Sequence, residues 1–571
     1  MPPSDKTRLD RTPHLRVASA QINPIVGEIK GNIEKVIAAV VEAKESGAEV
    51  ILFPEMVVTG YPVEDLALRP AFRKSSIDAV SNLAKKLSEL GCGEMLVVVG
   101  FLDDDGRPLN SIALLHGGEI KAKYVKRHLP NYGVFDEFRN FAAGSGTLVA
   151  RFNGIDIGVA ICEDIWRDEG PMTELAARKP GLVLVPNGSP YERSKDDLRF
   201  ELVRNRALQI GAPILYTNMF GGQDDLVFDG DSMAVGANGE LLARSPQFKY
   251  DLLIVDIPVE RGSSKPDCII SEELPTARGD IEARIAPALP ETEEIWSALV
   301  LGLRDYVEKN GFKSVVLGLS GGIDSAVVAT IAVDALGKDR VFGISLPSKY
   351  SSAHSKSDAA DLAKNLGIHF RTIEIEPVVE SYLRATTLQG IAEENVQARV
   401  RGSLLMGLSN QEGHLVLATG NKSELAVGYS TLYGDAVGGY APIKDVFKVD
   451  VWRLANWRNE KAKKDGIVAP IPESSITKEP SAELRPGQKD SDSIPDYRIL
   501  DQILELYIDE GGDASVIIEA GYEKKLVERI IQLVDKAEYK RRQYPPGPKV
   551  TPIAFGKDRR LPMTSHWREG N

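Results

Sequence analysis

The side chain best suited to covalent chemistry is a cysteine at the end of an apolar run. Cys162 follows IDIGVAI and opens the acidic segment CEDIW. A tight strand-to-helix turn presents a nucleophile well, and the thiolate is the reactive form of cysteine. A lone cysteine is more often a buried core residue, so Cys162 by itself does not establish an active site. His128, in YVKRHLP, is one candidate partner for a Cys–His dyad, but a single histidine is more often a local hydrogen-bonding residue.

A second segment has the composition of a phosphate-binding loop. SGGIDS stands between the apolar run SVVLGL and an alanine-rich helical pattern. Paired glycines permit close approach of the backbone to a ligand, and the first turn of a helix attracts anions. The loop has no Gly-Lys-Ser/Thr, so it is not a Walker loop, and the alternative is a Gly-Gly turn with a serine N-cap. The candidate nucleotide-binding residues are Gly318, Leu319, Ser320, Gly321, Gly322, Ile323, Asp324 and Ser325, of which Asp324 could hold magnesium.

The elements that position Cys162 alternate between short apolar runs and amphipathic stretches. Strands are predicted for six apolar runs: LRVASAQI, EVILFPE, MLVVVGF, IDIGVAIC, LVLVPNGS and APILYTNM. Helical patterns at 31–46 and 193–210 lie between some of them. Asn238-Gly239 is a turn signal within a later hairpin pattern. This order favours a layered α/β sandwich over a simple doubly wound sheet.

The elements around SGGIDS follow a different order. A helix at 293–309 precedes strand SVVLGLS, helix SAVVATIAVDAL, strand RVFGISL, helix DAADLAKNL and strand HFRTIEI, which predicts a parallel sheet with crossover helices. SGGIDS then lies at the carboxyl end of a strand, where such sheets bind ligands. The expected organisation is an N-terminal extension at 1–14, a first domain at 15–260, a Pro- and Ser-rich linker at 261–290 and a second domain at 291–571.

Composition excludes several classes of protein. The 571 residues exceed what one core usually holds. With 69 basic and 82 acidic residues the net charge is -13, which argues against a sequence-independent nucleic-acid binder. No apolar run is long enough for a membrane span, and no signal peptide is evident. Three scattered cysteines favour a reducing cytoplasm over a disulfide framework.

With Glu55 in FPE and Lys126 in YVKRHLP, Cys162 resembles the Glu-Lys-Cys triad of the nitrilase superfamily, in its NAD+ synthetase branch. The resemblance implies an αββα sandwich. Glu55 would take the thiol proton and later activate water, and Lys126 would stabilise the oxyanion and help to lower the thiol pKa. It further implies that Glu137 orients Lys126. The glutamine-binding residues that it implies are Tyr132, Ser189 and Lys195.

SGGIDS resembles the pyrophosphate loop of the ATP-pyrophosphatase superfamily, which has a doubly wound, Rossmann-like parallel sheet. The segments ATGNKSE and KEPSAELRPGQKDSDSIP resemble the NAD+ synthetases within it. The implied ATP contacts outside the loop are Thr419, Lys448 and Ser481. The implied deamido-NAD contacts are Asn395, Glu424 and Lys557, and the implied metal ligands are Asp324 and Glu424. Judged by spacing alone, Lys444 and Lys448 could instead be a solvated helix face.

The resemblance spans about residues 15–562 and identifies the chain as similar to glutamine-dependent NAD+ synthetases. It implies adenylation of deamido-NAD+ by ATP with Mg2+, then amidation by ammonia released from glutamine. It also implies a homo-oligomer without nucleic-acid or membrane partners. Two alternative hypotheses for the function are an amidotransferase for a different acid substrate and an inactive nitrilase fold that serves as an oligomerisation scaffold.

Overall fold

The computed structural model describes residues 13–272 and 281–567. The chain divides into two compact units: Met1–Gln223 with Phe228–Leu289, and Asp224–Val227 with Pro290–Asn571. Most of the predicted N-terminal extension lies outside the described residues, and the first strand begins at His14, the last position of that extension.

The first unit contains two large sheets. One has the order β14-β1-β2-β3-β4-β5, and its strands are β14 (Asp251–Pro258), β1 (His14–Gln21), β2 (Val50–Leu52), β3 (Leu96–Asp104), β4 (Pro108–His116) and β5 (Glu119–Val125). The other has the order β13-β12-β9-β8-β7-β6-β15. Its strands are β13 (Leu241–Arg244), β12 (Met233–Val235), β9 (Ile214–Asn218), β8 (Leu182–Asn187), β7 (Ile155–Val159), β6 (Leu148–Phe152) and β15 (Cys268–Ile269). A separate hairpin pairs β10 (Phe220–Gln223) with β11 (Leu226–Asp229).

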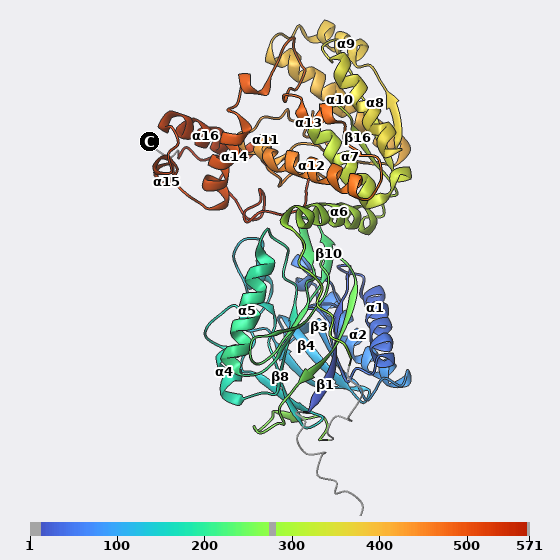
Figure 1. Cartoon of the computed structure of the whole chain (residues 1–571), viewed down its shortest axis with the longest axis vertical. Helices are drawn as coiled ribbons and strands as arrows, with labels where there is room; N and C mark the ends of the chain where they lie inside the picture. Colours follow the sequence, from blue (N-terminus) through green and yellow to red (C-terminus); the bar gives the residue numbers. More distant parts are fainter. Residues whose placement is uncertain (1–12, 273–280, 568–571) are drawn as a thin grey trace, which may run out of the picture. The chain divides into compact units, whose positions relative to one another are not determined.

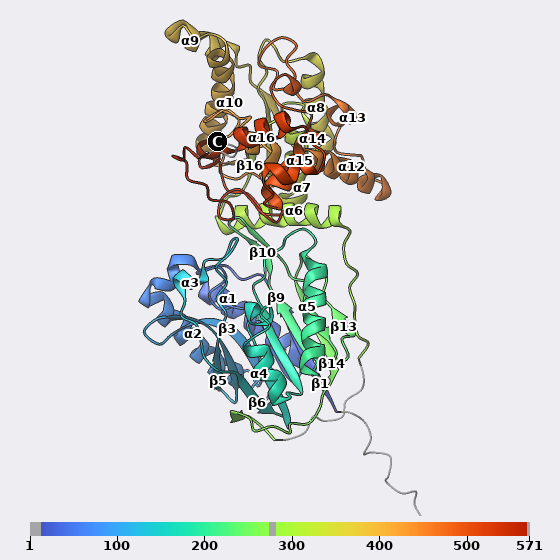
Figure 2. The same cartoon turned by 90° about the vertical axis from the view of Figure 1, so that its left-hand side faces the viewer.

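Alternation along the strands builds this unit in four layers. Leu15 and Val17 of β1 face a core shared with the second sheet, whereas Ala18 and Ala20 face a core that contains helix residues. Helices α1 (Ile29–Glu45) and α2 (Pro70–Glu89) cover the first sheet, and α4 (Pro171–Arg178) and α5 (Lys195–Ile210) cover the second (Figures 1 and 2). The predicted αββα sandwich is therefore confirmed.

The segment predicted as a linker contributes to this sandwich. β15 lies within 261–290 and pairs parallel with β6, where Cys268 stands opposite Ala150. Residues 273–280 of the segment lie outside the described residues. A two-residue strand has no detectable period, so this pairing could not be predicted from the sequence.

The second unit is built on a parallel sheet of order β18-β17-β16-β19. Its strands are β18 (His369–Thr372), β17 (Val341–Ser345), β16 (Val315–Gly318) and β19 (Leu415–Val416). The helices around it are α6 (Glu291–Lys309), α7 (Ile323–Leu336), α8 (Ala353–Leu366), α9 (Glu376–Thr386) and α10 (Ile391–Glu412). Val316 packs with residues of α9 and α10, while α7 is buried on nearly all sides and lies beside β16 and β17. This arrangement confirms the predicted doubly wound sheet.

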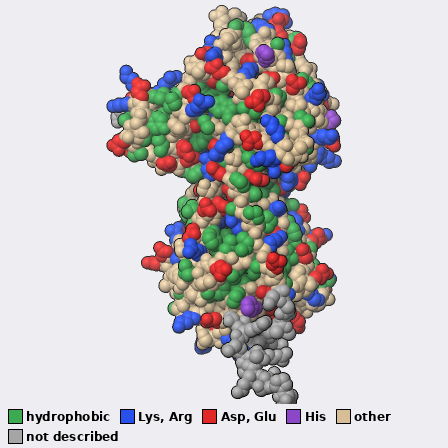
Figure 3. Space-filling view, in the orientation of Figure 1, with side chains coloured by type: hydrophobic (Ala, Val, Ile, Leu, Met, Phe, Trp, Pro, Cys, Tyr) green, Lys and Arg blue, Asp and Glu red, His purple; other side chains and the backbone are tan. Residues whose placement is uncertain are grey.

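A separate helical cluster follows in the chain. α11 (Lys422–Val427), α14 (Tyr497–Leu504) and α16 (Lys524–Lys536) share one apolar core. Further helices are α12 (Lys448–Lys464), α13 (Glu473–Thr477), α15 (Ala514–Glu519) and α17 (Glu538–Arg541). On the face shown in Figure 3, basic and acidic side chains are interspersed over both units. Within the described ranges, no helix combines the length and apolar character needed to cross a membrane.

Candidate active sites

Strand ends of both sheets in the first unit supply the predicted triad. Glu55 follows β2, Lys126 follows β5, and Cys162 begins the short 3-10 helix η2 (Cys162–Ile165) after β7. Lys126 Nζ lies 2.7 Å from Glu55 Oε1, and neither side chain is exposed. A buried ion pair is stabilising only when hydrogen bonds satisfy its remaining polar atoms, so the stability of this pair depends on the other contacts of Glu55.

Two further donors hold the Glu55 carboxylate. Asn110 Nδ2 donates to Oε1 over 2.7 Å, and the backbone N–H of Gly188 donates to Oε2 over 2.9 Å. A side chain at Gly188 would meet this carboxylate, because a Cβ there would lie 3.3 Å from Oε2 and 2.9 Å from a ring carbon of Tyr61. Glu55 is thus fixed in one orientation by partners from three segments of the chain.

Glu137 is the second carboxylate on Lys126. It opens the short helix α3 (Glu137–Asn140), its Oε2 lies 2.9 Å from Lys126 Nζ, and its Oε1 accepts a 2.8 Å hydrogen bond from the Tyr61 hydroxyl. Burial raises the pKa of Glu137 to about 7, helped by the charge of Glu55 and opposed by Lys126. Burial alone would lower the pKa of Lys126, but Glu137 and Glu55 together raise it. The two carboxylates therefore favour the charged form of Lys126.

Cys162 lies beside these groups in a left-handed conformation. Its φ is 44°, and only 5% of the residue is exposed. Burial raises the pKa of the thiol, and so does the charge of Glu55, whereas Lys126 lowers it. Lys126 thus lowers the thiol pKa as expected, but burial and Glu55 outweigh it, and the net shift of the thiol pKa is upward. The thiol is neutral until a base takes its proton.

The alternative Cys–His dyad has little structural support. The His128 Nδ1 lies 3.5 Å from Asp164 Oδ1, and the ring is packed against Gly170. The charged groups that dominate the environment of Cys162 are Glu55, Lys126, Glu137 and Glu163. His128 is thus held beside Asp164, which accepts its backbone N–H at 2.9 Å.

The predicted glutamine-binding residues differ in their surroundings. Tyr132 is half-exposed, and its hydroxyl donates to Glu163, the neighbour of Cys162, over 2.8 Å. Ser189 is buried after β8, with its N–H bonded to Asn218 Oδ1 over 3.0 Å. Lys195 is the first residue of α5 and is partly exposed. Ser189 thus adjoins Gly188, which holds Glu55, and Tyr132 lies against the residue that follows the nucleophile.

In the second unit, the predicted pyrophosphate loop joins β16 to α7. The Ser320 and Ser325 hydroxyls lie 3.1 Å apart, and Gly322 N–H donates to Ser320 Oγ over 3.2 Å. Gly321 has φ 80°, and a Cβ there would lie 2.3 Å from the Ser355 carbonyl oxygen. This position therefore requires glycine. The first turn of α7 follows directly and offers its free N–H groups to an anion.

Asp324, Glu424 and Lys448 come together beside this loop. Lys448 Nζ contacts the Asp324 carboxylate and lies 3.7 Å from Glu424 Oε1. Burial raises the pKa of Glu424 to about 8, as does the charge of Asp324, against the effect of Lys448. Lys448 opens α12 with a side chain that is only 2% exposed, and Lys444 precedes the helix, so the alternative that the two lysines form a solvated helix face is wrong.

These two carboxylates suit a cation that phosphates help to bind. Among the residues that the structure describes, no group of three or more His, Cys, Asp or Glu side chains could hold a metal ion. Mg2+ commonly uses one or two carboxylates together with water and substrate phosphates. Asp324 and Glu424 fit that donor set.

The other predicted ligand-binding residues lie on separate segments. Thr419 follows β19. Ser481 donates to the Gln488 carbonyl over 2.6 Å. Nearby Glu483 accepts a hydrogen bond over 2.8 Å from Oγ of Ser355 on α8, and the Ser355 backbone lies against Gly321 of the pyrophosphate loop. Asn395, on α10, accepts from Thr431 Oγ1 over 2.8 Å. Lys557 is exposed, and its carbonyl accepts from Arg560 Nε over 2.6 Å.

Comparison with known proteins agrees with both sites. The family described as carbon-nitrogen hydrolase matches residues 16–266, and that described as NAD synthase matches residues 295–544. The glutamine-dependent NAD(+) synthetase of Thermotoga maritima is 43% identical over 581 residues, covering 97% of this chain and 99% of its own. That of Acinetobacter baylyi is 43% identical over 561 residues, with the same coverage. The chain belongs to the glutamine-dependent NAD(+) synthetases.

Solved structures of glutamine-dependent NAD(+) synthetases extend over both units. That from Acinetobacter baumannii, in complex with ADP, has a TM-score of 0.73 and 41% identity, and covers 98% of this chain and 100% of its own. That from Cytophaga hutchinsonii has a TM-score of 0.79 over 97% of this chain and 98% of its own, but at 22% identity it shows the fold alone. The family resemblance of the sequence is confirmed.

Sequence reasoning missed several residues of the two sites. Asn110 and Tyr61 contact the two carboxylates of the first site from segments whose sequence carries no catalytic pattern. In the second site, Asn421 caps α11, and its Nδ2 donates to Asp324 Oδ1 over 2.9 Å. Asn421 had a usable signal, because an asparagine three residues before a glutamate is a capping-box pattern.

Proposed function

We propose that this chain hydrolyses glutamine in its first unit and uses the ammonia in its second unit to convert deamido-NAD+ and ATP into NAD+, AMP and pyrophosphate. The observation that carries the proposal is the buried Glu55–Lys126–Cys162 arrangement on the same chain as a glycine-containing phosphate loop. Membership of the family supports the pairing of these activities.

In the first unit, the neutral thiol of Cys162 loses its proton to Glu55 as sulfur attacks the glutamine amide carbon. Lys126 stabilises the oxyanion of the tetrahedral intermediate. Collapse of the intermediate returns the proton to the leaving nitrogen, so ammonia departs and a glutamyl thioester remains. Glu55 then activates water to release glutamate. Glu137 holds Lys126, while Tyr132, Ser189 and Lys195 bind glutamine, Lys195 through the α-carboxylate.

In the second unit, residues 318–325, Thr419, Lys448 and Ser481 bind ATP, and Asn395, Glu424 and Lys557 bind deamido-NAD+. The nicotinate carboxylate attacks the α-phosphorus, pyrophosphate leaves, and ammonia displaces AMP from the resulting acyl adenylate. Mg2+ held by Asp324 and Glu424 would neutralise phosphate charge. Lys448 offsets the charge that moves onto pyrophosphate. The ADP bound in the Acinetobacter baumannii relative supports a nucleotide site.

The deciding experiment supplies ATP, Mg2+ and deamido-NAD+ with either glutamine or ammonium, and measures NAD+. Cys162→Ala should lose the glutamine-supported reaction and keep the ammonium-supported one. Loss of neither reaction would refute the role of Cys162. An absence of NAD+ from the wild-type chain with both nitrogen sources would favour an amidotransferase for another acid or an inactive scaffold.

The remaining proposals concern the setting of the enzyme. We propose a first domain that begins at residue 15 and continues through β15 (Cys268–Ile269), a second domain at 291–571, a homo-oligomer, and a cytoplasmic location without nucleic-acid or membrane partners. The three cysteines are free, which is consistent with a reducing compartment. Light scattering of the purified chain tests the oligomer, and a monomer mass would reject it.

A further inference from the structure

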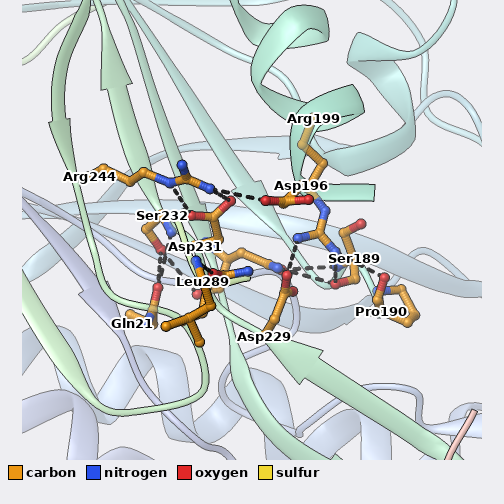
Figure 4. Close-up of polar contacts among 12 residues, drawn as sticks. Gln21, Ser189, Pro190, Asp196, Arg199, Asp229, Asp231, Ser232, Arg244 and Leu289 are labelled. Atoms are coloured by element: carbon orange, nitrogen blue, oxygen red, sulfur yellow. Dashed lines mark hydrogen bonds and ion pairs between the residues drawn. The ribbon is translucent and has the colours of Figure 1, made fainter. Parts of the chain in front are cut away.

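A buried ion pair lies beside the loop that carries Ser189. Arg199, on α5, places Nη1 2.6 Å from Asp229 Oδ2 at the end of β11, and neither side chain is exposed (Figure 4). The same guanidinium donates through Nη2 to the carbonyl oxygens of Pro190, over 3.0 Å, and Ser189, over 3.4 Å. One planar cation therefore holds a carboxylate and two successive carbonyls.

The loop held in this way has two tasks in the proposed glutaminase site. The N–H of Gly188 donates to Glu55, the proposed base, over 2.9 Å. Ser189 is a proposed glutamine contact, and both of its backbone polar groups bond to the Asn218 side chain, N–H over 3.0 Å and carbonyl over 3.1 Å. A shift of this loop would move a substrate contact and a partner of the base together.

Arg199 also fixes the helix that carries Lys195. Lys195 precedes it by four residues, which is one helical turn, so both project from the same side of α5. A second tie holds this first turn, because Asp196 Oδ2 lies 3.5 Å from Arg244, which pairs with Asp231 over 2.5 Å (Figure 4). The start of α5 is thus anchored to the strand segments around Asp229 and Asp231.

We propose that Arg199 is a positioning residue of the glutaminase site: paired with Asp229, its guanidinium fixes the loop at residues 188–190 and the first turn of α5, and thereby aligns Glu55, Ser189 and Lys195 with glutamine. This inference rests on the proposed function. The desolvation of a guanidinium is costly, and the fork geometry of arginine is what allows one side chain to reach all three acceptors. A lysine at this position could pair with Asp229 but not span the set.

The test measures steady-state NAD+ formation by Arg199→Met with glutamine and, separately, with ammonium. We expect the KM for glutamine to rise and kcat to fall, giving a loss of about 100-fold in kcat/KM, since a displacement near 1 Å costs about that much. The ammonium-supported rate should stay within about twofold of wild type, because its chemistry uses residues of the second unit. Arg199→Lys, which keeps the buried charge, should show the same rise in KM.

Arg151→Met is the matched control. Arg151 also pairs with a buried carboxylate, Asp156 at 2.8 Å, and donates to a carbonyl, that of Ser264 at 2.8 Å, but none of these is a proposed site residue. If Arg199→Met only lowers kcat at unchanged KM, or if Arg151→Met raises KM equally, Arg199 merely stabilises the fold and the inference is overturned. A wild-type chain that makes NAD+ from ammonium but not from glutamine would instead refute the proposed glutaminase.

Discussion

Replacement of Lys126 by methionine tests the electrostatics of the first site most directly. The substitution keeps the side chain as far as its Cε atom and removes a cation whose Nζ lies 2.7 Å from Glu55 and 2.9 Å from Glu137. Lys126 and Glu55 are fully buried, and Glu137 is 4% exposed. Two carboxylates would then share a site from which water is excluded and which has lost its counter-charge.

The expected loss of activity follows from two effects. Loss of one oxyanion donor costs about 10²–10³-fold in rate. Without Lys126, a proton on the carboxylate pair becomes favourable, because like charges this close resist joint ionisation. A protonated Glu55 cannot accept the thiol proton, and loss of general base catalysis costs a further factor of about 10²–10⁴. We therefore expect glutamine-supported NAD+ formation to fall by at least about 10⁴-fold.

The assay compares NAD+ formation from glutamine and from ammonium in the same preparation. Breaking a buried ion pair costs about 3–5 kcal/mol of stability, so the ammonium-supported rate reports whether the second unit is intact. Lys123→Met is the control: Lys123 lies on β5 and pairs with Asp103 at 2.9 Å, but its side chain is 38% exposed. A Lys126→Met enzyme that retained more than about a tenth of its glutamine-supported rate would refute oxyanion stabilisation by this residue.

Three further predictions concern single residues. Burial, and to a lesser extent the charge of Glu55, raises the pKa of Glu137 from 4.5 to about 7. The folded state therefore binds a proton more tightly than the unfolded state, and the free energy of unfolding falls as pH rises from 4.5 to about 7. In urea unfolding, Glu137→Gln should reduce the pH dependence of the free energy of unfolding over this range by up to about 1.4 kcal/mol per pH unit. An unchanged pH dependence would contradict the raised pKa of Glu137. Gly321→Ala places a Cβ 2.3 Å from the Ser355 carbonyl oxygen at a φ of 80°. The KM for ATP should therefore rise at least about tenfold with either nitrogen source, and an unchanged KM would show that the loop tolerates a side chain. Lys448→Met removes the cation that contacts the Asp324 carboxylate and should lower kcat of the ammonium-supported reaction by about 10²-fold. Glutamine hydrolysis, measured as glutamate release with glutamine as the only substrate, should match that of wild type.

The triad shows what local sequence could and could not supply. Glu55 and Cys162 each stand just after an apolar run, and this pattern predicted strand ends correctly, whereas Lys126 follows the alternating strand β5, for which no strand was predicted. Their family resemblance then suggested that they meet. The raised pKa of the Cys162 thiol was not predictable in this way, because it depends on burial and on the summed charges of Glu55, Glu137 and Lys126.

The fold divides along similar lines. Strand alternation and the change of order after residue 290 predicted a sandwich followed by a parallel sheet, since periodicity is a local property of the chain. The two-residue strand β15 was missed because it is stabilised by pairing with β6 and has no pattern of its own.

The sequence by itself determined which reactive side chains exist, which elements carry them and which family they resemble, because the periodicity of strands and helices and the glycines of loops are local features of the chain. Only the tertiary structure decided which partners hold them. Arg199 reaches Asp229, Ser189 and Pro190 across up to 30 positions of sequence, and Asn110 meets Glu55 across 55. Such contacts depend on how the layers pack, and in a core without water that packing sets the charge and orientation of the buried groups at the site.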